Sequence, residues 1–192
     1  MKEKIILASG SPRRREILTQ IGVDFRVVVS NEEECPKSTD PLDFPRENAA
    51  MKALAVSKKE PGAYVLGYDT LVFLVFLDGK PLGKPKTPEE ALEMLQKLNG
   101  KTHKVITGVA LAKDAQVIDT QQEETRVLFR ENTLQELKDY VNSKDPMDKA
   151  GAYGIQTRGA RLIKSITGCY YNVVGLPVAL TLDMLARREV EV

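Results

Sequence analysis

Three consecutive arginines near the N-terminus are candidates for binding an anion. They follow an apolar run, residues 4–8, that reads as a buried strand, and a break at Ser9-Gly10. Ser11 can cap a helix whose first position is Pro12, so residues 13–15 fall in its first turn. The free N–H groups at a helix N-terminus attract anions, whereas arginines there oppose the helix dipole. A bound phosphate would account for this placement, and a solvated basic turn is the alternative.

A carboxylate and a lysine are the candidates for acid–base and metal chemistry. Asp69 follows a predicted strand, residues 64–67, and strand ends line the ligand crevices of α/β sheets. A carboxylate there can bind a divalent metal or act as a general base, and a simple turn aspartate is the alternative. Lys52 lies on an alanine-rich helix face, so its ammonium group either snorkels to solvent or points into a cleft.

Two glycine-containing segments suit loops that contact a ligand. In Gly83-Lys84-Pro85 the proline holds the backbone of Lys84 extended and the glycine permits close approach, while a plain surface turn is the alternative. Residues 148–156 carry Lys149 and Gln156 among glycines, and an irregular connection is the alternative. Neither segment matches the Walker A pattern, which excludes a P-loop ATPase at the level of motifs.

The elements that must position these residues alternate irregularly along the chain. We expect helices at residues 12–21, 46–60, 88–98, 133–142 and 177–188, and strands at 4–8, 25–29, 64–67, 71–77, 104–112, 117–130 and 161–166. Thr133 and Glu136 form a capping-box pattern, residues 30–45 form a long acidic loop, and Asp78-Gly79 is a hairpin signal. This order favours an α/β or α+β mixed sheet, in one domain spanning residues 1–192.

Composition and charge exclude several classes of protein. The chain has 192 residues and a formal net charge of +1, so nothing overall indicates a nucleic-acid or membrane surface. Cys35 and Cys169 lack the spacing of a disulfide framework, and the N-terminal apolar run is too short for a signal peptide. His103, the single histidine, has no partner at metal-ligand spacing, so we interpret it as structural. We therefore expect a cytoplasmic globular protein.

Taken together, these segments resemble the Maf family of nucleoside triphosphate pyrophosphatases. The resemblance runs from Ile6 to about Leu185 and rests on several motifs in the order that the family shows. The motifs are Leu7-Ala-Ser-Gly-Ser-Pro-Arg-Arg14, Glu33-Glu34, Lys52-Ala53, Gly67-Tyr-Asp-Thr70, Leu82-Gly-Lys-Pro85, Thr107-Gly-Val109, Asp148-Lys-Ala-Gly-Ala-Tyr-Gly-Ile-Gln156 and Gly175-Leu-Pro177.

The resemblance implies an α/β fold with an elongated mixed β-sheet flanked by helices, two lobes and a central cleft, similar to inosine triphosphate pyrophosphatases. It also implies cleavage between the α- and β-phosphates of a nucleoside triphosphate, with a divalent metal cation, Mg²⁺ or Mn²⁺, as cofactor. Asp69 and Glu34 would be the catalytic carboxylates and the metal ligands. The residues that would bind the substrate phosphates are Ser9, Arg14, Lys52 and Lys84.

Three further positions, Arg13, Thr70 and Gln156, resemble the branch of the family that hydrolyses dTTP and UTP. The alternatives are a 7-methyl-GTP pyrophosphatase, a branch with Trp at the position of Arg13, and a non-enzymatic nucleotide-binding regulator of cell division. A regulator does not need two carboxylates and three cations together, which favours the enzyme. The expected partner is a small-molecule nucleotide, without nucleic acid or membrane, and a homodimer is left open.

The sequence departs from the family pattern at two places. Tyr68 stands where alanine is common, beside the carboxylate of Asp69. The stretch between Asp69 and Lys84 is a few residues longer than the usual spacing, which places Lys84 on a longer hairpin.

Overall fold

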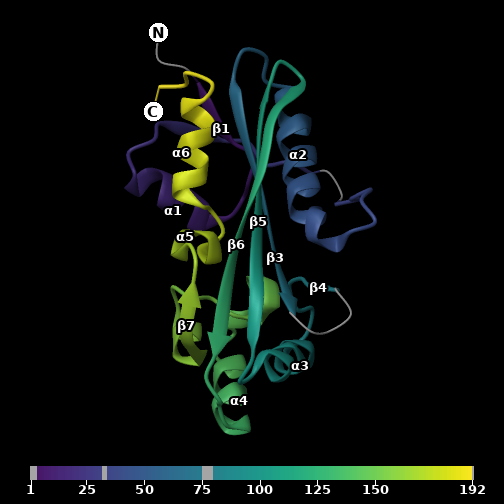
Figure 1. The fold of residues 1–192 in the computed structure, drawn as a ribbon, viewed down its shortest axis with the longest axis vertical. Helices are drawn as coiled ribbons and strands as arrows, with labels where there is room; N and C mark the ends of the chain where they lie inside the picture. The colour runs from purple at the N-terminus through teal and green to yellow at the C-terminus, as the bar shows by residue number, and fades with distance from the viewer. Residues whose placement is uncertain (1–3, 32–33, 75–79, 192) are drawn as a thin grey trace. The chain divides into compact units, whose positions relative to one another are not determined.

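The structure, a computed structural model, is a mixed α/β fold whose chain divides into two compact units. It describes residues 4–31, 34–74 and 80–191. Within these ranges, seven strands form one sheet in the order β2-β1-β3-β5-β6-β7, with β4 paired to β3. The strand β1 is parallel to both of its neighbours, whereas β4 on β3 and β7 on β6 are antiparallel. The mixed sheet and its helices confirm the fold class expected from the sequence (Figure 1).

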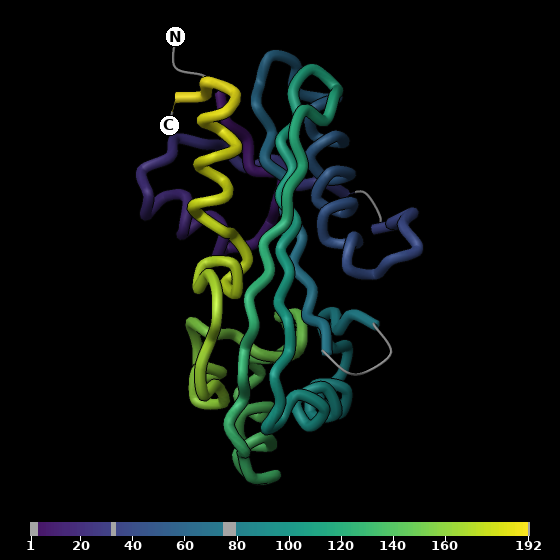
Figure 2. The backbone as a smooth tube through the Cα atoms, viewed as in Figure 1, coloured from purple at the N-terminus to yellow at the C-terminus, as the bar shows by residue number. Residues whose placement is uncertain are grey.

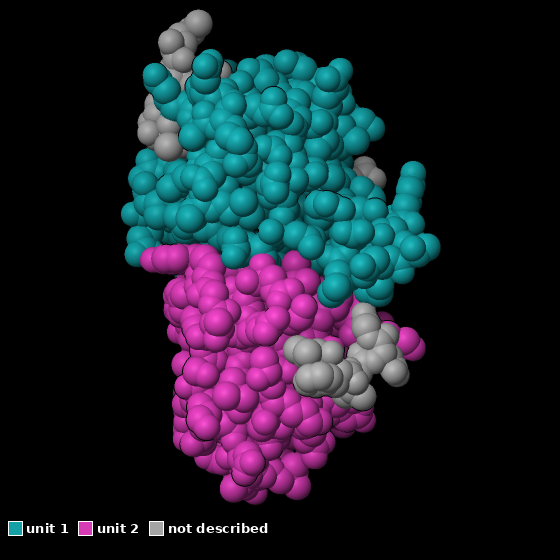
Figure 3. All heavy atoms as spheres, in the orientation of Figure 1, with its two compact units in different colours: residues 1–69, 107–123, 175–192 teal, residues 70–106, 124–174 magenta. Residues whose placement is uncertain are grey.

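Unit 1 consists of Met1–Asp69, Thr107–Glu123 and Gly175–Val192, so the C-terminal segment returns to the unit in which the chain begins (Figures 2 and 3). Its core is built from small residues, with Ala49, Ala53 and Ala110 fully buried beside Ile6 and Val65. The elements that lie wholly in it are β1 (Ile5–Leu7), α1 (Pro12–Gln20), β2 (Phe25–Val27), the 3-10 helix η1 (Pro41–Asp43), α2 (Phe44–Ser57) and α6 (Val178–Ala186).

Unit 2 consists of Thr70–Ile106 and Glu124–Val174, and larger side chains such as Leu95, Leu98 and Phe129 fill its core. Three strands, β3 (Tyr64–Leu74), β5 (Thr102–Lys113) and β6 (Gln116–Phe129), contribute residues to both units. The other elements of unit 2 are β4 (Pro81–Leu82), α3 (Pro88–Leu98), α4 (Leu134–Asn142), η2 (Asp145–Asp148), η3 (Ala150–Ala152), η4 (Arg158–Leu162), β7 (Ile163–Thr167) and α5 (Tyr170–Val174).

Most of the elements expected from the sequence are present. The helix α3 has the predicted bounds, and α4 begins with the predicted capping box of Thr133 and Glu136. The prediction of two strands around residues 68–70 is wrong, because β3 runs without interruption. The hairpin signal Asp78-Gly79 and the motif residue Glu33 lie outside the described residues. Within the part of the chain that the structure describes, no helix is both long and apolar enough to cross a bilayer.

Two glycines let α2 lie unusually close to the sheet in unit 1. A Cβ atom at Gly67 of β3 would stand 2.2 Å from the carbonyl oxygen of Ala49 and 2.9 Å from Ala53. A Cβ atom at Gly108 of β5 would stand 2.1 Å from the carbonyl oxygen of Pro45, near the start of α2. Contacts this short with backbone atoms are forbidden, so any larger residue must push the helix off the strands.

We expect Gly67→Ala to destabilise the protein by roughly 3 kcal/mol or more, the upper range for overpacking, because the clash is with backbone. The measurement is urea unfolding, in which the midpoint should fall while the slope stays constant. Gly83→Ala is the matched control, since a Cβ atom at Gly83 meets nothing within 4 Å. An unchanged midpoint for Gly67→Ala would show that α2 does not depend on this close approach.

An aromatic cluster of His103, Phe129 and Tyr153 lies in the core of unit 2. The three rings meet edge to face, with centroid distances of 4.9–5.3 Å. His103 is fully buried, and its Nε2 lies 2.7 Å from the hydroxyl of Tyr153. Burial lowers the pKa of His103 to about 3, since the charged imidazolium cannot be solvated there. The histidine is therefore a neutral core residue, in agreement with its structural interpretation.

Because the folded pKa of His103 lies below the unfolded value of about 6.5, the unfolded chain binds this proton first. We expect the titration of His103 to lower the free energy of unfolding as the pH falls from about 6.5 toward 3. The decrease should be at most about 1.4 kcal/mol per pH unit. His103→Gln keeps a hydrogen-bonding side chain but does not titrate. The gap in unfolding free energy between wild type and this variant should shrink from pH 8 to pH 5. Parallel curves for the two proteins would contradict the assignment.

Candidate active site

Asp69 lies inside β3, in unit 1, and faces α2. The prediction that it ends a strand is wrong, because β3 continues past it and pairs with β4 at Val72 and Phe73. The parallel neighbour β1 does end early, at Leu7 beside Leu66, so Asp69 lies beyond the end of β1. Side chains alternate along a strand, so Asp69 shares the α2 side of the sheet with Gly67. The side chain is buried, with an exposed fraction of 6% for the residue.

The carboxylate of Asp69 belongs to a charged group that we name the carboxylate–lysine cluster (Glu34, Lys52 and Asp69). The Nζ of Lys52 donates to Asp69 Oδ1 at 2.7 Å and to Glu34 Oε1 at 2.6 Å. The second oxygen of Asp69, Oδ2, accepts from the side-chain amide of Asn48 at 3.0 Å. The lysine is largely shielded from solvent, whereas half of the Glu34 side chain is exposed. The structure thus brings together three of the residues that the sequence singled out.

The helix α2 places Lys52 and Asn48 because of its spacing and its close packing. Residues four apart share one face of a helix, so Asn48 and Lys52 project together. On the adjoining stripe, Ala49 and Ala53 are fully buried against β3 and bring that face close to the strand. Lys52 does not snorkel to solvent, since its ammonium group contacts two carboxylates.

Arg14 takes the inward-facing position at the start of α1, in line with Ile17 and Leu18, which are buried. Its Nε donates to the carbonyl of Gly175 at 2.8 Å, and its Nη1 donates to the Oγ of Ser9 at 2.9 Å. Gly175 has a φ of 116°, which glycine adopts without strain, and this orients its carbonyl. Two motif segments far apart in the sequence therefore hold one guanidinium group.

The charge of Arg14 is set by burial and by nearby carboxylates. Burial lowers the pKa of the Arg14 guanidinium from its usual value, and the charge of Asp69 raises it again. Arginine remains protonated under physiological conditions. A cation in a poorly solvated position beside a hydroxyl, Ser9, suits the binding of phosphate oxygens, because desolvation strengthens its attraction for an anion.

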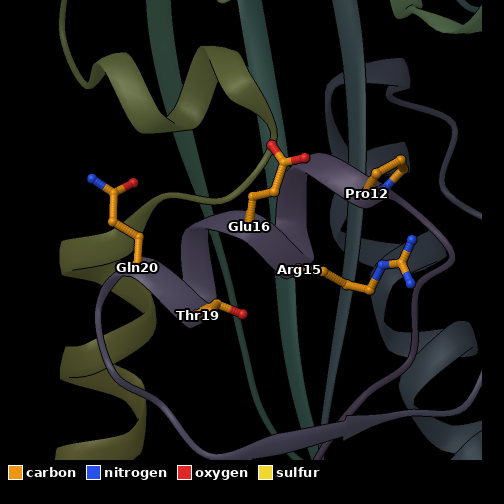
Figure 4. Close-up of a pocket in the computed structure, with 5 residues that line it drawn as sticks. All are labelled: Pro12, Arg15, Glu16, Thr19 and Gln20. Atoms are coloured by element: carbon orange, nitrogen blue, oxygen red, sulfur yellow. The ribbon is translucent and has the colours of Figure 1, made fainter.

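The opposite face of α1 turns outward. An open hollow there is lined by residues that come from this helix alone: Pro12, Arg15, Glu16, Thr19 and Gln20 (Figure 4). Arg15 is exposed and belongs to this outward face, whereas Arg13 and Arg14 are half-buried. The three arginines of the motif therefore differ in their exposure to solvent. Ser11 stands at the N-cap as expected, although its side chain makes no capping hydrogen bond.

The oxygen atoms near Asp69 fit a divalent cation that is shared with a substrate. Glu34 and Asp69 supply carboxylates, and the buried Oδ1 of Asn48 has no hydrogen-bond partner among the described residues. Within those residues, no group of three or more His, Cys, Asp or Glu side chains could enclose a metal by itself. Mg²⁺ typically binds one or two carboxylates and completes its shell with substrate phosphates and water, so this donor set suits it.

In unit 2, two of the segments predicted to contact a ligand meet each other. The backbone N–H of Gly151 donates to the carbonyl of Gly83 at 3.0 Å, which joins residues 82–85 to the glycine-rich segment. Gly151 has a φ of 67° and would clash with Val72 if it carried a Cβ atom. Lys84 is exposed and forms no ion pair with any described residue.

The glycine-rich segment is held by polar side-chain contacts that the sequence did not reveal. Lys149, considered above as a ligand contact, is instead buried and binds the carboxylates of Asp145 and Asp148. The hydroxyl of Thr157 donates to Asp145 at 2.6 Å. Gln156 lies beside Thr157 and is exposed, so its side chain is presented to solvent by an anchored backbone. Thr70 is half-buried and is also assigned to this unit.

The predicted site residues therefore fall into two groups. Unit 1 holds Ser9, Arg13, Arg14, Glu34, Lys52 and Asp69, and unit 2 holds Thr70, Lys84 and Gln156. The sequence reading missed Asn48, although an asparagine four residues before Lys52 on an alanine-rich helix was a usable signal. It also gave no sign that Tyr68 contacts Arg14, because the two residues are brought together only by the fold.

A sequence model of the Maf-like protein family matches residues 4–188. The chain belongs to this family. A protein of Symbiobacterium thermophilum named dTTP/UTP pyrophosphatase is 47% identical to this Maf-like protein over 186 residues, which are 96% of this chain and 94% of that protein. A protein of Bacillus cereus (strain G9842) with the same name is 45% identical over 191 residues, 99% of this chain and 98% of that protein.

A solved structure, that of the Staphylococcus aureus Ham1 protein, shares the fold of this Maf-like protein. The two superpose with a TM-score of 0.59 at 18% sequence identity, over 97% of this chain and 100% of that chain. At this level of identity the likeness concerns the fold alone. It agrees with the mixed sheet and flanking helices described above.

Proposed function

We propose that this Maf-like protein hydrolyses dTTP and UTP to the nucleoside monophosphate and pyrophosphate. Two relatives that span nearly the whole chain carry the name dTTP/UTP pyrophosphatase, which supports this substrate class. The observation that carries the proposal is the carboxylate–lysine cluster, in which one ammonium group contacts both Asp69 and Glu34. Phosphoryl transfer needs such a set, because cations must hold the phosphates while carboxylates place a metal and a water molecule.

In the proposed reaction Asp69 accepts a proton from the water that attacks the α-phosphorus. Its Oδ1 and Oδ2 are oriented by Lys52 and Asn48, which limits the motion of the base. Glu34 and Asp69 would hold a divalent cation, Mg²⁺ or Mn²⁺, which supplies charge neutralisation to the triphosphate. Lys52 is also proposed to contact the substrate phosphates, since its ammonium group has three N–H donors and the hydrogen bonds to Asp69 and Glu34 use two of them.

Arg14 and Ser9 are proposed to bind phosphate oxygens, with the guanidinium already fixed by Gly175. Lys84 is proposed as a further phosphate contact on the basis of its motif, and its exposed ammonium group is compatible with this. Removal of one preorganised charge contact typically costs about 3 kcal/mol of transition-state stabilisation. A cytoplasmic location, where nucleotides are abundant, is part of the proposal.

Arg13, Thr70 and Gln156 are proposed to select the base. A guanidinium, a hydroxyl and an amide together offer donors and acceptors for the O4, N3–H and O2 edge of uracil or thymine. The larger cationic ring of 7-methylguanine favours an aromatic stacking partner instead, and the chain has arginine at position 13. These roles rest on the sequence motifs.

The first experiment tests which phosphate bond is cleaved and whether Asp69 acts as the general base. With dTTP in oxygen-18 water, we expect thymidine monophosphate carrying the label, together with unlabelled pyrophosphate. Asp69→Asn removes the base and should lower turnover at least about a hundredfold, the low end of general-base effects. Asp119→Asn is the control, since this carboxylate pairs with Arg187 elsewhere in unit 1 and should leave turnover unchanged.

Two results of this experiment would overturn the proposal. Release of orthophosphate and the diphosphate as first products would mean that another bond is cleaved. Near-normal turnover of a folded Asp69→Asn protein would assign Asp69 to structure alone. Binding of nucleotide without any turnover would favour the non-enzymatic regulator.

The second experiment ranks the bases by kcat/KM for dTTP, UTP, CTP, GTP and 7-methyl-GTP. We expect dTTP and UTP to lead. Gln156→Ala should reduce the preference for them more than it weakens triphosphate binding, because the variant loses the amide proposed to hydrogen-bond the base edge and keeps the cations proposed to bind the phosphates. If 7-methyl-GTP has the highest kcat/KM, the protein is a 7-methyl-GTP pyrophosphatase instead. An unchanged ranking in the variant would remove Gln156 from base selection.

A further inference from the structure

Tyr68 is a large aromatic side chain in the middle of β3, next to Asp69 but on the other face of the sheet. Its neighbours Gly67 and Asp69 face α2, so the alternation of a strand turns Tyr68 away from that helix. It is fully buried, and its hydroxyl lies 3.1 Å from the Oγ1 of Thr181 in α6, which is also buried. A short residue would leave this space unfilled and could not reach Thr181.

The guanidinium of Arg14 lies over the ring of Tyr68. The Cζ of Arg14 lies 5.6 Å from the ring centroid, within the range of a cation–π contact. The carbonyl of Gly175, the hydroxyl of Ser9 and the ring of Tyr68 all contact this group, and each comes from a different segment. A long flexible side chain is thereby held in one orientation before any ligand arrives.

We propose that Tyr68 is a positioning residue that fixes Arg14 for triphosphate binding, with Thr181 fixing the ring in turn. Arginine loses considerable rotamer freedom when it binds a ligand, so a guanidinium that is already immobile binds at a smaller entropic cost. The inference rests on the proposed function only for the role of Arg14 in binding phosphate. The contact between Tyr68 and Arg14 can be measured without any turnover.

The test compares two substitutions at position 68. Tyr68→Leu removes the π face, and Tyr68→Phe keeps it while removing the hydroxyl. For Tyr68→Leu we expect the KM for dTTP to rise about tenfold with kcat changed far less, as loss of a desolvated cation–π contact implies. In proton–nitrogen NMR, hydrogen exchange at the Arg14 Nε–H should accelerate by a similar factor. Tyr68→Phe should change both measurements less than Tyr68→Leu, and the change that remains measures the contribution of the contact with Thr181.

A matched control comes from the same strand. Tyr64 of β3, which also belongs to unit 1, lies under a cation as well. The Nζ of Lys113 is 3.9 Å from the centroid of its ring. Tyr64→Leu removes a comparable buried ring without touching Arg14. It should leave both the KM for dTTP and the exchange of Arg14 at wild-type values. A change equal to that of Tyr68→Leu would mean that any lost ring disturbs the unit, and the proposal would fail.

The outcomes separate this inference from the proposed function. Wild-type exchange of Arg14 in Tyr68→Leu would show that the ring only fills the core. Faster exchange with an unchanged KM would show that the contact does not serve the substrate, which also overturns the proposal. If the wild-type protein hydrolyses no nucleotide, the proposed function fails while the exchange data still decide whether Tyr68 holds Arg14. If Tyr68→Leu does not fold, ring-current shifts of the Arg14 side chain in the wild-type spectrum decide the same question, and their absence contradicts the contact.

Discussion

The close approach of α2 to β3 and β5 is the constraint on which the candidate site depends. Gly67 and Gly108 remove the side chains that would stand in the path of the helix backbone. Only at this distance can an ammonium group from α2 reach a carboxylate in the middle of β3 at 2.7 Å. The alanines on the inner stripe of α2 follow from the same constraint, because larger side chains there would hold the helix farther from the strands. A packing requirement thus sets the geometry of a charged site.

The alternation of side chains along β3 then distributes charge to both faces of the sheet. Asp69 turns toward α2 and meets Lys52, while Tyr68 turns toward α6 and meets Arg14. Two adjacent residues of one strand therefore serve opposite charges, since Asp69 supplies a carboxylate and Tyr68 contacts the guanidinium of Arg14. Asp69 contacts α2, whereas Tyr68 contacts α6 and the start of α1.

Local signals in the sequence predicted the elements better than they predicted the site. Capping residues and periodicity located α3 and α4, because those features act within a few residues of the chain. The polar residues around Asp69 suggested a strand end, yet β3 continues, since strand length is decided by partners such as β4. Charged side chains were singled out by type, and the structure brings Glu34, Lys52 and Asp69 together. Their partners, such as Gly175 for Arg14, come from distant segments that local patterns do not reveal.

The hydrogen bonds of Asp69 leave it able to do chemistry. A carboxylate has about four lone-pair positions, and only two donors, Lys52 and Asn48, contact this one in the hydrogen bonds described. A buried carboxylate needs such partners, because a charge without them is expensive to desolvate. Asn48 provides one without adding charge, so the carboxylate–lysine cluster keeps two negative charges against one positive. In the proposed reaction that remaining negative charge would attract a divalent cation, and the free lone pairs would be available to the cation or to a water molecule.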